Sequence, residues 1–449
     1  MIGGRGLVWS FLFVFATLAV AESGAGSNRQ CIESLLGVLQ PPAVYMGIIF
    51  ATEGTASGNN EVYIHINHHH PRTDDARSYL DLIKAEVAKI PQKAILYLNT
   101  HDNDAYDIIS RSGNPVEGER RFQALFEACP HVYFLAWNPT LYNASRGNVF
   151  PRTIPVPDFE ILRDGDFEAV PFEQRGAGIA WRGVSTGTWV GGKYEPSDRY
   201  RAVELMQSMP NSNVKFSGLV QGVGGIPQHM MGSGMNRGEM AARKAIMDVD
   251  GNANAWQGLR WKLRSGVAVV KFASSRNFVQ WYYPLLQDGV HLALIKSYDD
   301  KAKAAVKALL EDDSRLQSLG RHGREFALKY LSQDAAKAYL AEIIPNIHTV
   351  AKEMELADWR IDGQPPRLRA FGYVDTPEPE TTEAPTQVPL ITTSEPPAQV
   401  PSPLAETAGR LPSRAEQASE DDGGYRWLLF VVVAAVCLEC FRRKRKVRR

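Results

Sequence analysis

The pattern of apolar positions divides the middle of the chain into alternating strands and helices. Between about residues 30 and 371, short apolar runs typical of buried strands alternate with stretches whose apolar residues have helical spacing. The runs Lys93–Leu98 and His131–Ala136 predict strands, and the spacing within Ser78–Ile90 predicts a helix. Strands that alternate with helices of about 10–15 residues indicate βαβ units, and hence an α/β fold with parallel sheets.

The second half of the chain continues this alternation, and long helices follow it. Further strands are predicted at Gly178–Trp181, Val214–Leu219, Val267–Phe272 and His291–Ile295. Further helices are predicted at Arg121–Ala128, Arg201–Ser208, Trp256–Leu263 and Lys301–Leu310, and Arg315–Val350 is almost wholly helical in pattern. Ligands of parallel α/β sheets bind at the carboxyl ends of the strands. We therefore expect functional side chains in the loops that follow strands.

The two ends of the chain predict entry into the secretory pathway and a membrane anchor. Residues 1–21 combine Arg5, an apolar core and the ending Ala19-Val20-Ala21, which is typical of a cleaved signal peptide, with an uncleaved anchor as the alternative. Residues 425–441 predict a transmembrane helix, because a basic tail at 442–449 follows their apolar run. We expect a type I protein of the endoplasmic reticulum or Golgi membrane, with the folded part in the lumen.

The anchor is short, and a stalk precedes it. Its unbroken apolar run, Trp427–Leu438, has fewer than the ~20 residues that usually cross a bilayer, but a thin early-secretory membrane accommodates such a length. A GPI signal is the alternative, although such signals do not end in a basic cluster. Residues 375–422 are rich in Pro, Thr and Glu, which predicts an extended stalk between the folded part and the anchor.

Charge and cysteine content narrow the class of protein. Lys+Arg and Asp+Glu both count 50, and seven of the basic residues lie at 442–449, so the remainder is mildly acidic and a nucleic-acid-binding protein is disfavoured. Four cysteines cannot form a disulfide lattice. Cys31 and Cys129 are the two expected in the lumen, where they could form one bond. Asn143 begins an Asn-Ala-Ser sequon for N-glycosylation.

The loop after the strand that ends at Leu98 contains closely spaced carboxylates. Asp102, Asp104 and Asp107 lie close together, and a carboxylate held in a cleft can act as general base toward a hydroxyl. Asp and Asn residues in such a loop can equally cap the next helix. Earlier in the chain, His68-His69-His70 resembles a metal site, but adjacent histidines in a loop cannot all face one ion, so no metal is expected.

The turn at 180–187 predicts an anion-binding loop. Its polar and glycine residues include Arg182, Gly183, Ser185 and Thr186. Glycine-rich turns after strands expose backbone N–H groups to phosphates, and Arg199 and Arg201 can add charge against a diphosphate. An ordinary surface turn is the alternative. The same turn matches the Gly-x-Ser-x-Gly pattern of α/β-hydrolases, but residues 188–192 have no helical pattern, which disfavours a serine hydrolase.

A third loop, at 248–266, combines Asp, Asn and Gly residues with the start of a predicted helix. Its candidate ligand-binding residues are Asp250, Asn252, Asn254, Trp256 and Arg260. A helix start stabilises an anion, and Lys262 also lies nearby. The alternative is that the Asp and Asn residues cap the helix while the tryptophan packs in the core.

Three segments together resemble one known family. Trp181-Arg182-Gly183, followed by Ser185-Thr186-Gly187, is similar to the Trp-Arg-Gly-x-x-Thr-Gly segment of the CAP10-type glycosyltransferases, family 90. Residues 250–271 resemble the donor segment of this family, particularly of its lipopolysaccharide glucosyltransferase branch. Gln280–Leu286 with Gly289-Val290-His291 resembles a further segment, and the match runs in order from about residue 45 to 340. The eukaryotic branch includes protein O-glucosyltransferases and O-xylosyltransferases of the secretory pathway.

The resemblance implies a GT-B enzyme with two Rossmann-like domains that face a cleft. Residues 30–175 would carry the base and bind the acceptor, and 176–371 would bind the nucleotide sugar and end in closing helices. The enzyme would move glucose or xylose from a UDP-sugar to a hydroxyl of a protein or glycan, with inversion and without a required metal or other cofactor. Asp102 aligns with the family's catalytic base. Residues 182–187 with Arg199 or Arg201 would hold the diphosphate, and the loop at 250–260 would complete the nucleotide site.

Two positions depart from the family pattern. Val184 stands where the family often has Ser, and Gly258 aligns with an Arg at the start of the donor helix. Arg260, two residues further on, is a candidate substitute for that Arg. These departures keep open a catalytically inactive lumenal protein that binds a glycan or a protein, and an unrelated α/β enzyme is the third alternative.

Overall fold

The computed structural model describes part of the chain, and the fold is given for that part. The described residues are 28–39, 47–54, 65–66, 76–99, 115–162, 169–187, 189–190, 193–194, 197–220 and 226–372. They all belong to the first of two compact units, Met1–Pro377, and the second unit is Glu378–Arg449. Several predictions lie outside the described residues: the signal peptide 1–21, His68–His70, Asp102, the stalk 375–422, the transmembrane helix 425–441 and the tail 442–449.

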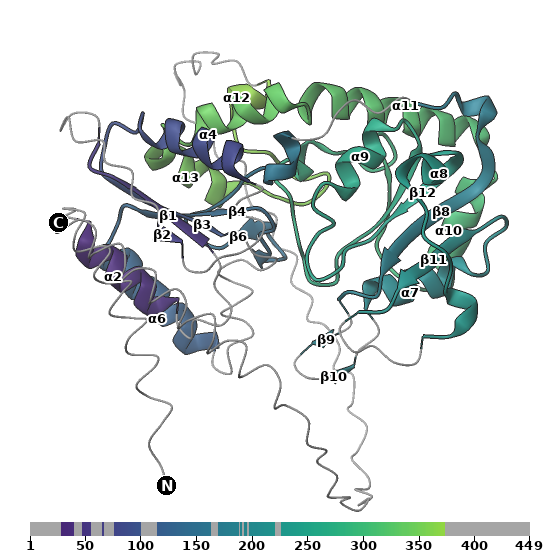
Figure 1. Cartoon of the computed structure of the whole chain (residues 1–449), viewed down its shortest axis with the longest axis horizontal. Helices are drawn as coiled ribbons and strands as arrows, with labels where there is room; N and C mark the ends of the chain where they lie inside the picture. Colours follow the sequence, from purple (N-terminus) through teal and green to yellow (C-terminus); the bar gives the residue numbers. More distant parts are fainter. Residues whose placement is uncertain are drawn as a thin grey trace, which may run out of the picture. The chain divides into compact units, whose positions relative to one another are not determined.

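The described chain is a mixed α/β structure with two five-stranded sheets (Figure 1). The first sheet has the order β2 (His65–Ile66), β1 (Gly47–Thr52), β3 (Ala94–Asn99), β4 (Val132–Ala136) and β7 (Thr153–Pro155). The second has the order β11 (Asn213–Gly218), β8 (Gly176–Val184), β12 (Arg243–Asp248), β13 (Ala268–Phe272) and β14 (Ala293–Ile295). Two short hairpins pair β5 (Leu141–Asn143) with β6 (Asn148–Val149) and β9 (Trp189–Val190) with β10 (Lys193–Tyr194).

The first sheet is only partly parallel, which differs from the all-parallel prediction. β3, β4 and β7 run parallel, but β1 is antiparallel to both β2 and β3. The cause is the path of the chain, which pairs β2 with β1 as a hairpin and then crosses through α4 (Arg77–Val87) to the far side of β1. Such a split βαβ unit leaves one antiparallel strand between two parallel ones.

Helices cover both faces of the first sheet (Figure 1). Successive strand side chains point to opposite faces, so Ile48 and Phe50 belong to one core cluster while Ile49 and Ala51 belong to another. One face packs against α4 and two C-terminal helices, α12 (Gln333–Ile343) and α13 (Ile347–Leu356). The other packs against α2 (Arg29–Val38) and α6 (Pro115–Ala128).

A disulfide joins the two helices on that second face. Cys31 in α2 is bonded to Cys129, which directly follows α6, and their Cα atoms are 5.7 Å apart. Both cysteines are buried among Ile32, Leu35 and Phe122. The bond therefore attaches the first described helix to the core of the first sheet.

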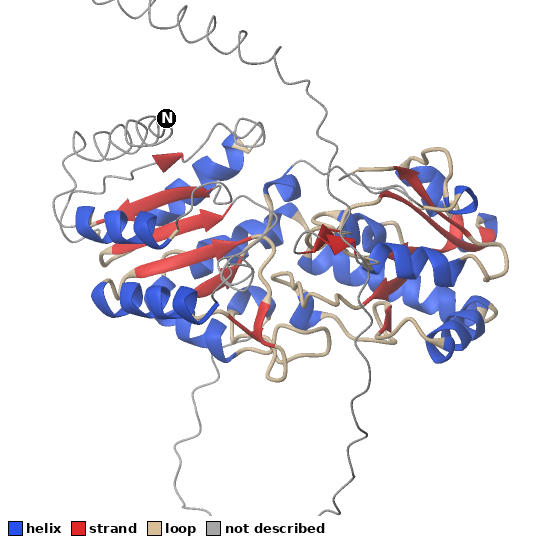
Figure 2. Cartoon of the chain, turned by 90° about the horizontal axis from the view of Figure 1, so that it is seen from below, coloured by secondary structure: helices blue, strands red, loops and turns tan. Residues whose placement is uncertain are grey.

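The second sheet is fully parallel and is also covered on both faces (Figure 2). One face packs against α7 (Asp198–Met206) and α10 (Asp300–Leu310). The other face packs against α8 (Arg237–Ala241), α9 (Gly258–Arg264) and α11 (Asp313–Tyr330). Side-chain caps fix the starts of α7 and α10, since Ser197 accepts from the N–H of Tyr200 at α7 and Asp299 accepts from that of Ala302 at α10.

Most predicted strands and helices are confirmed, with shifted ends. The predicted long helical region is three helices, α11, α12 and α13. The short 3₁₀ helices are η2 (Phe159–Leu162), η3 (Phe172–Gln174), η4 (Gln228–Met230), η5 (Tyr283–Leu285) and η6 (Arg369–Phe371). None of the helices in the described part of the chain is long and apolar enough to cross a membrane.

Candidate functional site

The strand order of the second sheet puts its topological switch point at the carboxyl ends of β8 and β12, and the place between the loops after these two strands is named the crevice. The chain leaves β8 toward β11 on one side and returns to β12 on the other, so the connections of these neighbours diverge. The order is that of a doubly wound sheet, in which ligands bind outside the carboxyl ends at this switch point. The loops that follow β8 and β12 are the two loops that the sequence singled out in this half.

These two loops touch through their backbones. Gly187 has φ +84°, and its N–H donates to Oδ1 of Asn252 over 2.9 Å. A Cβ on Gly187 would lie 2.7 Å from the carbonyl oxygen of Gly251, and one on Gly251 would lie 2.5 Å from Oγ1 of Thr186. Glycine is therefore needed at Gly187, where a Cβ would meet backbone atoms at a positive φ, while a Cβ on Gly251 would displace the side chains of Thr186 and Arg199.

An arginine from α7 lies at the junction of the two loops. Nη1 of Arg199 donates to the carbonyl oxygen of Val184 over 2.8 Å, and its guanidinium lies 5.7 Å from the ring centre of Trp181. A Cβ on Gly251 would come within 2.7 Å of Nη2 of the same side chain. The junction thus has a fixed positive charge, at the first turn of a helix whose positive dipole end lies there too.

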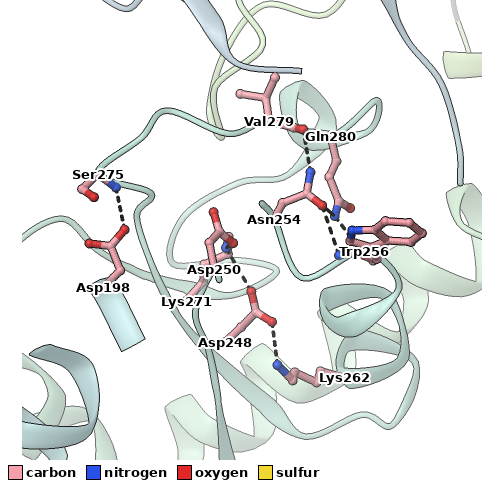
Figure 3. A network of polar contacts seen from close by, with 10 residues as sticks. All are labelled: Asp198, Asp248, Asp250, Asn254, Trp256, Lys262, Lys271, Ser275, Val279 and Gln280. Carbon is pink, nitrogen blue, oxygen red and sulfur yellow. Dashed lines mark hydrogen bonds and ion pairs between the residues drawn. The ribbon is translucent and has the colours of Figure 1, made fainter. Parts of the chain in front are cut away.

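A buried cluster of four charges includes Asp250, which directly precedes Gly251 of the junction (Figure 3). Asp248, at the end of β12, accepts from Nζ of Lys262 over 2.6 Å and from Nζ of Lys271 over 3.0 Å. Lys271 also donates to Oδ1 of Asp250 over 3.0 Å. The four side chains are 0–6% exposed, so two cations and two anions neutralise one another away from water.

Burial and ion pairing shift the pKa values of these carboxyl groups in opposite directions. Burial favours the neutral form of Asp248, but Lys262 and Lys271 outweigh it and hold the pKa of that carboxyl well below its usual value. Burial raises the pKa of Asp250, and the charge of Asp248 adds to that rise although Lys271 opposes it. Asp248 is thus the permanent anion of the cluster.

A third carboxylate approaches the cluster from the start of α7. Oδ2 of Asp198 accepts from the N–H of Ser275 over 2.9 Å (Figure 3). Burial, together with the charge of Asp198 and a hydrogen bond to it, raises the pKa of the Tyr298 hydroxyl. Oδ2 of Asp250 is buried and has no hydrogen-bond partner within the described residues.

Trp256 has a strained backbone that two buried amides hold in place. Its φ is +48°, which is rare for a bulky residue. Nε2 of Gln280 donates to the carbonyl oxygen of Trp256 over 2.9 Å and to Oδ1 of Asn254 over 2.8 Å, and Asn254 in turn accepts from the N–H of Trp256 over 3.1 Å (Figure 3). The indole packs edge-on against Trp137 and Phe159, which follow strands of the first sheet.

The position of Arg182 differs from the expected phosphate-binding turn. β8 extends to Val184, so Arg182 and Gly183 lie in the strand, and the turn is limited to residues 185–187. The guanidinium of Arg182 donates to the carbonyl oxygens of Asn213 and Ser233 over 2.6 and 2.7 Å. Backbone acceptors near β11 therefore occupy this side chain, and it does not join the two loops at the crevice.

Ser185 is buried and holds the loop after β11. Its Oγ donates to the carbonyl oxygen of Val220 over 3.2 Å and accepts from the N–H of Val220 over 2.9 Å. The side chain has 0% exposure, which is incompatible with an accessible nucleophile. The hydrolase alternative is therefore not supported at this serine.

The structure brings some of the remaining sequence-predicted site residues together and leaves others apart. The structure brings Thr186, Arg199, Asp250, Asn252, Asn254 and Trp256 together at the crevice. Arg201 is exposed on α7, and Arg260 is buried in α9. Because α9 begins at Gly258, Trp256 precedes the helix instead of starting it. Asp102 lies outside the described residues.

Asp198, Lys271 and Gln280 were not among the sequence-predicted site residues. The signal for Lys271 is a lysine inside the otherwise apolar strand Ala268–Phe272, because a buried lysine needs an anionic partner. Asp198 follows a helix-capping serine, so its sequence context indicates only a first-turn acid.

Two further features lie away from the crevice. Oδ1 of Asn143, in the sequon, accepts from Oγ of Ser145 over 2.7 Å at the surface. Within the described residues, no group of three or more His, Cys, Asp or Glu side chains could hold a metal ion.

Comparisons with known proteins give only distant similarity to solved structures. No protein-family model matches the sequence, and no curated protein matches it. Among solved structures, the chain is similar to a sucrose-phosphate synthase from Thermosynechococcus elongatus. The identity is 13%, the match covers 56% of this chain and 67% of that chain, and the TM-score is 0.33. The function of the crevice therefore has to be derived from its own residues.

Proposed function

We propose that this protein is a GT-B-type glycosyltransferase of the CAP10 type that transfers a sugar, glucose or xylose, from a UDP-sugar to a hydroxyl of a protein or glycan. The observation that supports this proposal is the crevice at the switch point of the parallel sheet, where Gly187 and Gly251 bring two loops into backbone contact beside Arg199. Close backbone approach and a fixed cation are what a diphosphate requires.

In the proposed reaction, the acceptor oxygen forms a bond to the anomeric carbon while the bond from that carbon to UDP breaks. Asp102 takes the acceptor proton, which is needed because a neutral alcohol is a poor nucleophile. Arg199 and the positive end of α7 stabilise the charge that develops on the leaving diphosphate. Attack from the face opposite the leaving group inverts the anomeric centre, and these fixed charges do the work that a metal ion does elsewhere.

The proposed setting is the lumen of the endoplasmic reticulum or Golgi, with the protein anchored as a type I membrane protein by one C-terminal helix. The disulfide between Cys31 and Cys129 supports an oxidising compartment, because such bonds are rare in the cytosol. The exposed sequon at Asn143 is a glycosylation site in that setting.

A second candidate function is a catalytically inactive binding protein of the same fold, specific for a glycan or protein. The observation that favours it is the position of Arg182, whose guanidinium is occupied by backbone acceptors. The crevice then has one cation fewer for a diphosphate than the sequence predicts. Turnover, and not UDP binding, separates the two candidates.

The test is UDP release by the full chain, purified in detergent, with a panel of UDP-sugars and with acceptor extracts. We expect turnover with one donor, reduced by ~10² or more in Asp102→Asn, the range of a lost general base. Arg199→Met should reduce it by about 10²-fold, the scale of a lost transition-state donor. Arg315→Met, on the exposed face of α11, is the matched control.

Two results would contradict the proposal. Unchanged turnover in Asp102→Asn would refute the assignment of the base. UDP binding without turnover of any donor, with all acceptor extracts present, would favour the inactive binding protein.

A further inference from the structure

Two hydrogen bonds join residues 139–141, which follow β4 of the first sheet, to residues 277–279, which follow β13 of the second sheet. The N–H of Val279 donates to the carbonyl oxygen of Pro139 over 2.9 Å, and the N–H of Leu141 donates to the facing carbonyl group over 3.0 Å. The two residues between these bonds form an antiparallel bridge. We name this pair of segments the joint, and it links the two sheets directly.

Arg276 connects the joint to the loop after β12. Its Nη1 donates to the carbonyl oxygen of Asn252 over 2.8 Å, and its guanidinium lies 4.6 Å from the ring centre of Phe278 in the joint. The Oδ1 atom of the same asparagine accepts from the N–H of Gly187 over 2.9 Å. Asn252 thus has one hydrogen bond at the crevice and one toward the joint, so a displacement of the crevice loops changes its bond to Arg276.

Two further contacts fix the same loop to the segments that follow β4 and β13. Nδ2 of Asn254 donates to the carbonyl oxygen of Val279 over 2.8 Å (Figure 3). The ring centres of Trp256 and Trp137 lie 5.4 Å apart, and Trp137 directly follows β4. Because φ at Trp256 is +48°, these contacts hold the loop in a strained conformation that has a relaxed alternative. Coupling between two sites requires such a second arrangement.

The end of β4 adjoins the strand that leads to the predicted base. Ala136, the last residue of β4, lies opposite Asn99, the last residue of the neighbouring parallel strand β3. In the sequence, Asp102 follows Asn99 by three positions. A change in the position of the end of β4 would therefore reach the start of the loop that contains the predicted base.

We propose that Arg276 is a positioning residue that couples ligand occupancy of the crevice to the position of the end of β4. A ligand that holds Gly187 and Asn252 together also holds Asn252 against Arg276, and thereby stabilises the joint. By linkage, a change at the joint alters the affinity for that ligand by the same factor. This coupling regulates the proposed diphosphate site, and it rests on the proposed function only for the identity of the ligand.

The first test needs no ligand and measures hydrogen exchange of the full chain in detergent by mass spectrometry. The reporters are the amides of Leu141 and Val279, which are bonded across the joint. Gly187→Ala forces the crevice loops apart, and exchange of both amides should become about fivefold faster or more, the lower end of coupling between sites. Gly234→Ala, with nothing within 4 Å of its new Cβ, should leave both rates unchanged. Unchanged exchange in α10 excludes global unfolding as the cause.

Variants of Arg276 test whether the effect passes through this side chain. In the Arg276→Met background, Gly187→Ala should change the two amide rates by about twofold or less, because the bond to Asn252 is gone. Arg276→Lys keeps a donor for that carbonyl oxygen and should keep most of the effect. Arg315→Met, on the exposed face of α11, is the control for loss of an arginine and should keep all of it.

Two results of the ligand-free test would overturn the inference. The first is unchanged exchange of the two reporter amides in Gly187→Ala, and the second is an equal change in the wild-type and Arg276→Met backgrounds. Should Gly187→Ala not fold, Asn252→Ala takes its place, because it removes the same crevice contact without a clash and keeps the carbonyl group that Arg276 binds.

The second test adds UDP to the wild type. Saturating UDP should slow exchange of the Leu141 and Val279 amides about fivefold or more, and Arg276→Met should reduce this protection. UDP binding without protection would overturn the coupling and leave the transferase standing. Absence of UDP binding would refute the diphosphate site, and the ligand-free test would still decide the coupling.

Discussion

Gly187 lies so close to the backbone of Gly251 that a Cβ on Gly187 would be 2.7 Å from the carbonyl oxygen of Gly251. The two glycines belong to loops after neighbouring parallel strands, β8 and β12. Their contact sets the spacing of the loops at the proposed diphosphate site, because the close approach leaves no room for a side chain on Gly187.

Replacement of Gly187 by alanine should therefore damage the site directly. The new Cβ clashes with backbone atoms, and φ at this residue is +84°. Both the clash and the unfavourable backbone conformation therefore destabilise the loop in the variant. We expect UDP-sugar turnover to fall about 10²-fold, the scale of an ångström-sized misplacement. Gly234→Ala, where nothing lies within 4 Å of the new atom, is the control and should keep full turnover. Equal turnover in both variants would show that the loop contact has no functional role.

Replacement of either lysine in the buried charge cluster should lower the free energy of unfolding, but by different amounts. Lys271→Met leaves Asp250 without its ion-pair partner and Asp248 with one, and should lower the free energy of unfolding by about 3–5 kcal/mol. Lys262→Met should cost less, because Asp248 keeps Lys271. Urea unfolding measures both, and Asp250→Asn should recover part of the loss in the Lys271→Met background. A larger loss in Lys262→Met than in Lys271→Met would contradict the assigned pairing.

Gln280 should control the environment of Trp256. Gln280→Leu removes the hydrogen bonds that this side chain donates to the carbonyl oxygen of Trp256 and to Oδ1 of Asn254, and puts an apolar side chain beside these two buried acceptors. We expect a loss of about 1–3 kcal/mol in stability and a changed near-ultraviolet circular dichroism signal from the packed indoles of Trp256 and Trp137. Gln317→Leu, at an exposed position of α11, is the matched control. An unaltered spectrum in Gln280→Leu would mean that other contacts hold the strained residue.

Stability should fall as the pH is lowered through the titration range of a half-buried histidine. Burial, with help from the charge of Lys93, lowers the pKa of His131 to about 4. Between pH 6.5 and 4 the unfolded chain therefore binds a proton that the folded chain does not, so this contribution to stability is complete above pH 6.5 and is lost as the pH falls toward 4. His131→Gln should flatten the slope of unfolding free energy in that window, measured by urea titration at several pH values. His229→Gln, which is exposed, should leave the slope as it is.

Much of the fold follows from local pattern, and the misses have physical causes. The strand at Ala94–Asn99 and the helices from 313 to 356 were predictable, because their apolar spacing is regular and uninterrupted. The strand Arg243–Asp248 was missed because it begins with two charged residues and ends in a buried aspartate. Its apolar centre is too short to predict a strand from the sequence. The buried aspartate is stable there because Lys262 and Lys271 pair with it, and these pairs form only in the folded structure.

The candidate site was predictable as a set of loops, but not as a set of contacts. Position after a strand selected Asn252, Asn254 and Trp256, and the structure places them near one another because the carboxyl ends of parallel strands share one edge. The orientation of Arg182 was not predictable, because it depends on the carbonyl groups of Asn213 and Ser233, which tertiary packing alone brings near.

The return of the C-terminal helices to the first sheet makes that half of the protein discontinuous in sequence. Oη of Tyr339 in α12 donates to the carbonyl oxygen of Pro155 at the end of β7, and α13 also contacts β7. A fragment that stops at residue 175 would therefore expose the apolar face that these helices cover, and it should aggregate on expression. During synthesis, one face of the first sheet stays uncovered until α12 and α13 have left the ribosome. This half of the protein therefore cannot complete its folding before the second half has been synthesised.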